Sequence, residues 1–214
     1  MRLRMWCCVL LVILVFASEV FAQADVGVSG SAVLSIQPTD NWGGGPYLDH
    51  GVGGLTPGLG VSLDVTWPAG ISIIGEFSTV LAFEQAQDGR FVPTRRDMFH
   101  VGYSDTRLRD SLFSGLVGFT IRDWTRLRLV GGVTVLQTTM TLDRAPVTDF
   151  DLYDTSYERM ALTGGADFRT PLSPRITFVL SGRYVRANRA ELASNLGAGR
   201  HIIRVGAGVR LGLN

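Results

Sequence analysis

Hydrophobic and polar residues alternate at every second position along most of the chain. The C-terminal stretch 200–214 shows this clearly, because one set of alternate positions is apolar and the other is mostly arginine and glycine. Successive side chains of a strand point to opposite faces, so this stretch predicts a strand with one apolar and one polar face. Similar alternation recurs in seven further stretches separated by turn residues. The eight predicted strands are 26–37, 59–67, 71–83, 109–122, 126–140, 157–169, 175–186 and 200–214.

The connections between these predicted strands alternate in length. Short turns follow the second, fourth and sixth strands. Longer polar loops follow the first, third, fifth and seventh strands, at 38–58, 84–108, 141–156 and 187–199. An even number of strands, with short turns at one rim and long loops at the other, is the layout of an outer-membrane barrel. The sequence therefore predicts an all-β fold, an eight-stranded antiparallel up-and-down transmembrane β-barrel with both chain ends on the short-turn side.

A soluble lipocalin-like barrel is the alternative, since it shows the same alternation with the apolar face inside. The polar faces favour the membrane barrel: they carry Ser, Gly, Thr and Arg, whereas a wetted surface normally mixes both signs of charge. All 20 basic residues are arginine. Large aromatic residues also lie near the predicted strand ends, as in the girdles at membrane interfaces. They are Trp67, Trp124 and Phe168 on the turn side and Phe83, Tyr157 and Tyr184 on the loop side.

The first 24 residues have the layout of a secretory signal peptide. Arg2 and Arg4 precede an apolar run, and small-residue cleavage sites end at Ala22 or Ala24. The apolar run is marginal for spanning a bilayer, so we expect Sec export and cleavage, with residues 25–214 forming the barrel. Both cysteines of the chain lie in this segment, so the predicted barrel contains no disulfide.

No catalytic residue, cofactor or metal site is predicted. The histidines are His50, His100 and His201, and only His100 has a nearby serine, Ser104, which is too far along a strand for a hydrogen bond. The chain has no nucleophile elbow, metal-binding histidine pair or phosphate loop. The acidic segment 148–154 lacks the glycine and glutamate of an EF-hand loop, so we expect it to be hydrated rather than to bind a cation. A formal net charge of +1 argues against nucleic acid as a partner.

The lumen is the first candidate site. An eight-stranded barrel has an interior just wide enough for its own side chains. Because a buried carboxylate needs a partner, we predict a lumen ion-pair network centred on Glu76, Arg183 and Arg204. The predicted network consists of Asp64, Glu76, Asp167, Arg128, Arg183 and Arg204. We expect it to plug the barrel, with a narrow pore as the alternative. Arginines predicted to be solvated at the turn-side mouth are Arg122, Arg126, Arg169, Arg175 and Arg210.

The last predicted strand also resembles a barrel-assembly signal, in which a glycine precedes alternating hydrophobic residues. Gly208, Val209, Leu211 and Leu213 fit that pattern, but Asn214 stands where a terminal aromatic residue is usual. The chain resembles the small eight-stranded outer-membrane barrels, such as the OmpA transmembrane domain, OmpX and Ail. The resemblance covers residues 25–214 and rests on architecture. It implies a bacterial outer-membrane location, surrounding lipid and lipopolysaccharide, and the barrel assembly machinery as a partner.

The long loops are the second candidate site, because variable functions usually reside in loops. Aromatic residues near arginines suit contact with an extracellular protein or glycan, and they also suit a hairpin extending beyond the membrane surface. The residues concerned are Trp42, Tyr47, Phe91, Phe99 and Tyr103. We therefore expect a monomeric, non-enzymatic barrel with a structural or adhesive role. The alternatives are a narrow pore for ions or very small solutes and an outer-membrane lipid-modifying enzyme.

Overall fold

The computed structural model describes residues 24–37, 54–92, 100–121, 124–145, 153–187 and 201–213. These residues form antiparallel strands, and no helix long and apolar enough to cross a membrane occurs among them. Residues 1–23 lie outside this range, so the signal peptide stays a prediction. The strands are β1 (Asp25–Gln37), β2 (Gly54–Thr66), β3 (Ile71–Val80), β4 (Phe83–Val92), β5 (His100–Ile121), β6 (Trp124–Ala145), β7 (Tyr153–Pro171), β8 (Ile176–Ala187) and β9 (His201–Gly212).

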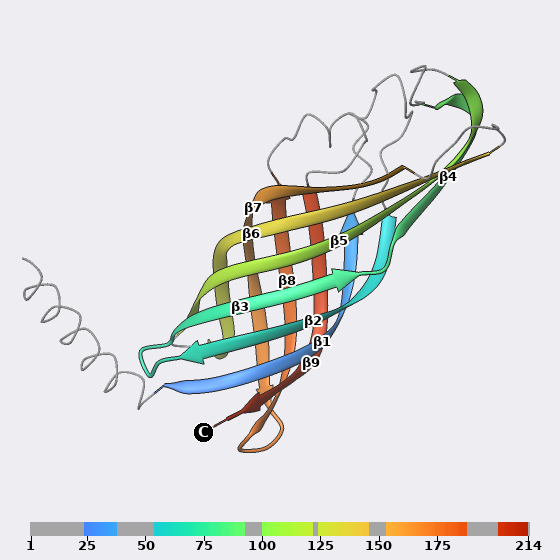
Figure 1. Cartoon of the computed structure of the whole chain (residues 1–214). Coiled ribbons are helices and arrows are strands. Elements are labelled where there is room, and N and C mark those ends of the chain that lie inside the picture. Colours follow the sequence, from blue (N-terminus) through green and yellow to red (C-terminus); the bar gives the residue numbers. More distant parts are fainter. Residues whose placement is uncertain are drawn as a thin grey trace, which may run out of the picture.

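The strands close into a barrel. Their neighbour order is β3-β2-β1-β9-β8-β7-β6-β5-β4, and pairing between β3 and β5 completes the circle. Strand β4 follows β3 along the same edge of β5, so the closed wall has eight strands. The first and last strands, β1 and β9, pair with Gly27 opposite Gly212. The start of β1 and the end of β9 both lie at the short-turn rim (Figure 1). The predicted eight-stranded antiparallel up-and-down barrel is confirmed.

The apolar set of residues faces outward. In β9, Val205 and Leu211 are 43% and 51% exposed, whereas Arg204 and Arg210 are only 3% and 4% exposed. Elsewhere on the wall, exposed leucine, valine, isoleucine and phenylalanine side chains continue this outer face over the other strands. Soluble monomers rarely expose contiguous apolar patches larger than roughly a few hundred Å². The outer wall therefore matches hydrocarbon, and the arginines line the lumen.

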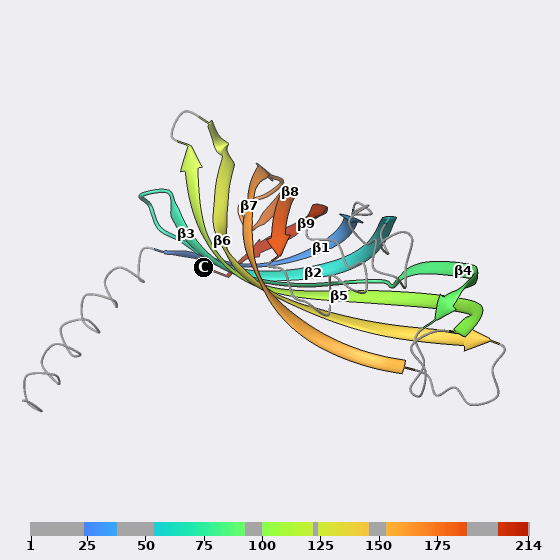
Figure 2. The same ribbon diagram turned by 90° about the horizontal axis from the view of Figure 1, so that it is seen from above.

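Part of the chain extends beyond the barrel as an open sheet made of β4 and the adjoining ends of β5, β6 and β7. Strands β5 and β6 have 22 residues each, whereas about 9–11 residues suffice to cross hydrocarbon. Strand β8 joins β7 only from Ala161 onward, so the preceding part of β7 has no partner on that side among the described residues. Figure 1 shows this extension at the end opposite the C-terminus, and Figure 2 shows it projecting to one side.

This open sheet corrects the prediction of loops at 84–108 and 141–156. Strands β4 and β5 pair from Phe83 opposite Leu108 to Val92 opposite His100, and β6 and β7 pair as far as Leu142 opposite Tyr153. A sheet that stands in water on both faces needs no apolar face, so the alternation that marks a bilayer strand is absent. In 83–92, five of the ten residues are charged or carry an amide side chain, and the apolar residues are spread over both sets of alternate positions.

The open sheet departs from the barrel beside Pro57 of β2. The Pro57 carbonyl accepts a hydrogen bond of 2.9 Å from the Leu81 N–H, but proline has no N–H to donate in return. The Thr56 hydroxyl donates to the Leu81 carbonyl instead, at 3.1 Å. The ladder between β2 and β3 has its last pair at Gly58 and Val80. Beyond this point β4 has β5 as its only strand partner within the described part of the chain.

Candidate functional site

Eight charged side chains in the lumen, four acids and four arginines, alternate in one continuous series of ion pairs that we call the ion chain. They come from seven strands, so only closure of the barrel brings them together. From the turn-side mouth inward the members are Asp25, Arg210, Asp64, Arg128, Asp167, Arg183, Glu76 and Arg204.

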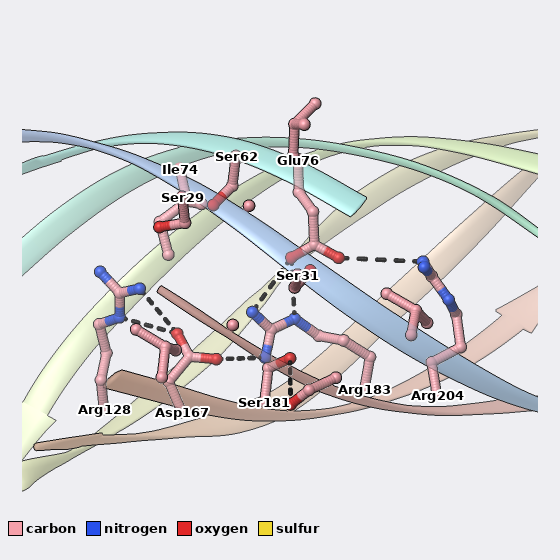
Figure 3. A pocket seen from close by; sticks show the side chains of 16 residues that line it. Ser29, Ser31, Ser62, Ile74, Glu76, Arg128, Asp167, Ser181, Arg183 and Arg204 are labelled. Atoms are coloured by element: carbon pink, nitrogen blue, oxygen red, sulfur yellow. Dashed lines mark hydrogen bonds and ion pairs between the residues drawn. The ribbon is translucent and has the colours of Figure 1, made fainter. Parts of the chain in front are cut away.

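In the central part of the ion chain, two arginines each bridge two carboxylates. Figure 3 shows Arg183 between Asp167 and Glu76, with Arg128 on the other side of Asp167. Arg183 places Nη1 2.6 Å from Asp167 Oδ1 and Nη2 3.1 Å from Glu76 Oε2. Arg128 places Nη2 2.7 Å from Asp167 Oδ2 and Nη1 3.4 Å from Asp64 Oδ2. Asp167 therefore holds one arginine on each of its oxygens.

Another arginine extends the ion chain to the mouth, and the fourth ends it inside the lumen. Arg210 places Nε 2.9 Å from Asp64 Oδ1 and Nη2 2.9 Å from Asp25 Oδ2. The Asp25 side chain is 52% exposed, so this end of the ion chain reaches water. At the other end, Arg204 Nη1 lies 3.8 Å from Glu76 Oε1.

The chemistry of the guanidinium group explains why this lumen uses arginine. Its planar fork offers five N–H donors and can bridge two carboxylates, whereas an ammonium group is a point charge on a flexible stem. Asp64 and Asp167 are each 1% exposed, and a carboxylate buried to that extent is tolerable only if it is paired and hydrogen-bonded. Alternation of four positive and four negative groups leaves the ion chain neutral.

Glycines on neighbouring strands make room for three of these arginines. A Cβ atom added at any of the three glycine positions would collide with arginine side-chain atoms or come within 3.1 Å of them. The pairs are Arg210 over Gly27, Arg128 over Gly118 and Arg183 over Gly165. Inward-facing glycine thus gives long side chains space to cross the lumen, in addition to the bending expected of glycine in a narrow barrel.

Serine hydroxyls and a small cavity lie beside the ion chain. The cavity has a volume of about 40 Å³ and is lined by Ser29, Ser31 and Ser181 as well as by Glu76 and Arg204. A cavity of this size holds roughly one to three water molecules. Figure 3 shows Arg183 reaching across this region between Asp167 and Glu76.

An apolar layer lies in the lumen on the loop side of the ion chain. Ile202 and Leu136 are fully buried there, although their positions belong to the inward-facing set of their strands. The layer consists of Leu112, Leu136, Ala161, Val185, Ala187 and Ile202. Beside it, the buried Asp110 accepts a hydrogen bond of 2.7 Å from Thr138. The ion chain and the apolar layer therefore fill the lumen at two successive levels.

We expect this filled lumen to prevent steady ion conduction. An eight-stranded barrel has little interior space beyond its own side chains, and here those side chains are paired or packed. Planar-bilayer recordings of the refolded protein should show no regular single-channel steps, with a known porin run under the same conditions as the positive control. Reproducible unitary conductance in the wild-type protein would mean that the ion chain and the apolar layer move apart to open a path through the lumen.

All six residues predicted for the lumen network lie in the ion chain. Two further members, Asp25 and Arg210, were not predicted. Arg210 was expected to be solvated at the mouth, which is wrong: it is 4% exposed, because its side chain turns inward over Gly27 to reach Asp64. Its place in the same inward-facing set as Arg204 was the signal available in the sequence.

The other mouth arginines are closer to their expected positions. Arg126 and Arg175 are exposed, and Arg169 is half-buried. Arg122 lies outside the described residues.

The predicted aromatic girdle is described in part. Trp124, Phe168 and Tyr184 are 67%, 43% and 45% exposed on the outer wall. Trp67 is half-buried. Phe83 lies in β4 and Tyr157 in β7, but their side chains are outside the described part of the structure, so the complete girdle stays a prediction.

The predicted loop-contact residues are mostly outside the described residues. Trp42, Tyr47 and Phe99 are among those not described, and Phe91 and Tyr103 fall in strands β4 and β5 instead of a loop. The side chains of His100 and Ser104 are likewise not described, so their separation stays a prediction. Across the described ranges, no group of three or more histidine, cysteine or acidic side chains is arranged to hold a metal ion.

Comparison with known proteins shows the fold. No protein-family model matches the chain, and no curated protein matches its sequence. The attachment invasion locus protein Ail of Yersinia pestis superposes with a TM-score of 0.55 at 13% identity, covering 88% of this chain and 99% of Ail. Ail in complex with the heparin analogue sucrose octasulfate gives 0.54 at 12% identity, covering 88% and 99%. A major outer membrane protein from Thermus thermophilus gives 0.54 at 9% identity, covering 89% and 99%.

These similarities and the geometry together define the class of protein. The chain has the fold of the small eight-stranded outer-membrane β-barrels, with an apolar outer wall and a lumen filled by its own side chains.

Proposed function

We propose that this chain is a bacterial outer-membrane protein that binds an extracellular protein through its open sheet. The open sheet is the single observation that carries the proposal, because it projects beyond the barrel and ends in the edge strand β4. Outer-membrane lipid and lipopolysaccharide would surround the apolar outer wall, and the barrel assembly machinery would insert the barrel. Neither catalysis nor transport is part of the proposed role.

An edge strand supports this role on physical grounds. The backbone N–H and C=O groups on the free edge of a sheet can pair with an added strand, which gives affinity through main-chain hydrogen bonds. In the described part of the chain, β4 pairs with β5 over Phe83–Val92 and has no strand on its other side. An extended segment of a partner protein is the ligand that such an edge accommodates best.

The lumen and the known proteins of this fold give further support. A lumen occupied by the ion chain and the apolar layer directs function to the outer surface. Ail, which has this fold, carries attachment and invasion in its name and has been solved with a heparin analogue. Binding at the cell surface is therefore within the capacity of a barrel of this size.

Removing most of β4 and the end of β5 that pairs with it tests the proposal. In the variant, an Asn-Gly turn replaces residues 85–106, so that Glu84 and Arg107 stay paired as the last residues of the hairpin. We expect cells carrying this variant to lose attachment to immobilised extracellular-matrix proteins, while the barrel itself still folds and shows heat-modifiable migration on a gel.

A matched control carries a Gly-Ser insertion in the short turn at 67–70, on the opposite rim. It should attach as the wild type does. Unchanged attachment by the truncated, folded barrel would contradict the proposed role of the open sheet. Attachment to a sulfated glycan alone would contradict the choice of a protein partner.

A further inference from the structure

Three polar side chains form a cluster on the outer wall at the loop end of β8 and β9. Arg186 of β8 lies directly opposite His201 of β9 in the antiparallel register. The Tyr184 hydroxyl is 2.5 Å from His201 Nδ1, and the two rings stack with centroids 5.9 Å apart. Residues opposite each other in such a pair have Cβ atoms about 4.5–5.5 Å apart, so the Arg186 and His201 side chains start from adjacent positions on the outer wall.

The direction of this hydrogen bond decides what His201 offers to a ligand. When the Tyr184 hydroxyl donates to Nδ1, the neutral imidazole carries its hydrogen on Nε2, which is then a hydrogen-bond donor. Among the described residues, no hydrogen bond or ion pair engages Arg186 or His201 Nε2. The residue opposite Arg186 on its other side is Leu162, which is uncharged and 66% exposed. In that tautomer the cluster offers a guanidinium fork and an Nε2–H donor from directly opposite positions of β8 and β9.

The position of the cluster places it at the level of lipid headgroups. Below it on the same outer face lie Ile203 and Val205 of β9 and Leu180 of β8, all more than 40% exposed. Tyrosine on an outer wall lies at the membrane interface, and Arg186 is two residues farther along β8. Two residues of a strand span about 7 Å, so Arg186 extends just beyond the hydrocarbon.

We propose that Arg186 and His201 bind the phosphate monoester group of an outer-leaflet lipid. Guanidinium and phosphate form paired, charge-assisted hydrogen bonds, and the histidine Nε2–H supplies a further donor to the same oxygens. The exposed Leu162 and Ile203 flank the cluster and would contact the acyl chain of the same lipid. This site depends on the outer wall alone, so it does not rest on the function proposed for the open sheet.

Native mass spectrometry of the refolded full-length protein, titrated with phosphatidic acid in detergent, tests the proposal. We expect Arg186→Gln to weaken phosphatidic acid binding about tenfold, as loss of a charge-assisted hydrogen bond does. We expect His201→Phe, which keeps the ring stack, to weaken it by a smaller factor. Arg126→Gln removes an exposed arginine at the opposite rim and should leave the binding unchanged. Heat-modifiable migration confirms that each variant is folded.

Two outcomes would overturn the inference. Equal binding by the wild type and Arg186→Gln would show that the cluster is not the site. Inorganic phosphate that displaces phosphatidic acid at equal concentration would assign the cluster to a free anion instead of a lipid.

Discussion

Replacing Asp167 with alanine is expected to lower the free energy of unfolding by about 3–5 kcal/mol. Asp167 is 1% exposed and holds Arg128 and Arg183 on its two oxygens, at 2.7 and 2.6 Å. Its removal leaves two buried guanidinium groups short of a partner and divides the ion chain in the middle. This substitution should cost more than Glu76→Ala, because Glu76 is partly exposed and its second pair, with Arg204, is 3.8 Å long.

Urea unfolding of the refolded barrel in detergent, followed by tryptophan fluorescence, measures the effect. Glu158→Ala is the matched control, since Glu158 is an exposed acid on the same strand, β7. It should change the free energy of unfolding by no more than about 0.5 kcal/mol. If Asp167→Ala and Glu158→Ala unfold at the same urea concentration, the ion chain does not stabilise the barrel.

Replacing Gly165 with alanine is expected to lower the free energy of unfolding by at least about 3 kcal/mol, or to prevent folding altogether. A Cβ atom at this position would overlap the backbone carbonyl oxygen of Gly182 on β8. It would also lie 3.1 Å from Cδ of Arg183, whose side chain crosses over Gly165 to reach Asp167. The substitution therefore separates β7 from β8 and displaces the central arginine of the ion chain at once.

The adjacent residue, Gly164, provides the control. It points outward, and a Cβ atom there would have no neighbour within 4 Å. Gly164→Ala should change the free energy of unfolding by no more than about 0.5 kcal/mol, because it alters only the surface that faces hydrocarbon. The measurement is again urea unfolding, together with the fraction of heat-modifiable protein after refolding. Equal tolerance of alanine at both positions would show that the close approach of β7 and β8 is not required.

Much of the barrel could be predicted from the sequence, because the side-chain direction in a strand is a local property. The alternation in 200–214 corresponds to β9, with Arg204 inside and Val205 outside. The order of short and long connections predicted which strands are neighbours, since consecutive strands of an up-and-down barrel pair with each other. Opposite positions across the lumen then suggested that Glu76 meets Arg183.

The open sheet and the apolar layer could not be predicted in the same way. The alternation weakens along β4 and the end of β5, so the sequence predicts a loop at 84–108, with a hairpin beyond the membrane surface as the alternative, and the pairing of β4 with β5 agrees with that alternative. Leu112 and Ile202 stand at inward positions, where a single hydrophobic residue looks like a break in the pattern. Only their contact with inward residues of other strands shows that they form a layer.

By itself the sequence determined the strands of the barrel and which residues share each face, because both follow from a period of two along a single strand. Only the tertiary structure decided that Arg210 is paired with Asp25 and Asp64 and that Asp167 holds two arginines. Those partners depend on the stagger of strands far apart in the sequence and on glycines that let one side chain cross a neighbouring strand, and neither is visible in the pattern of one strand.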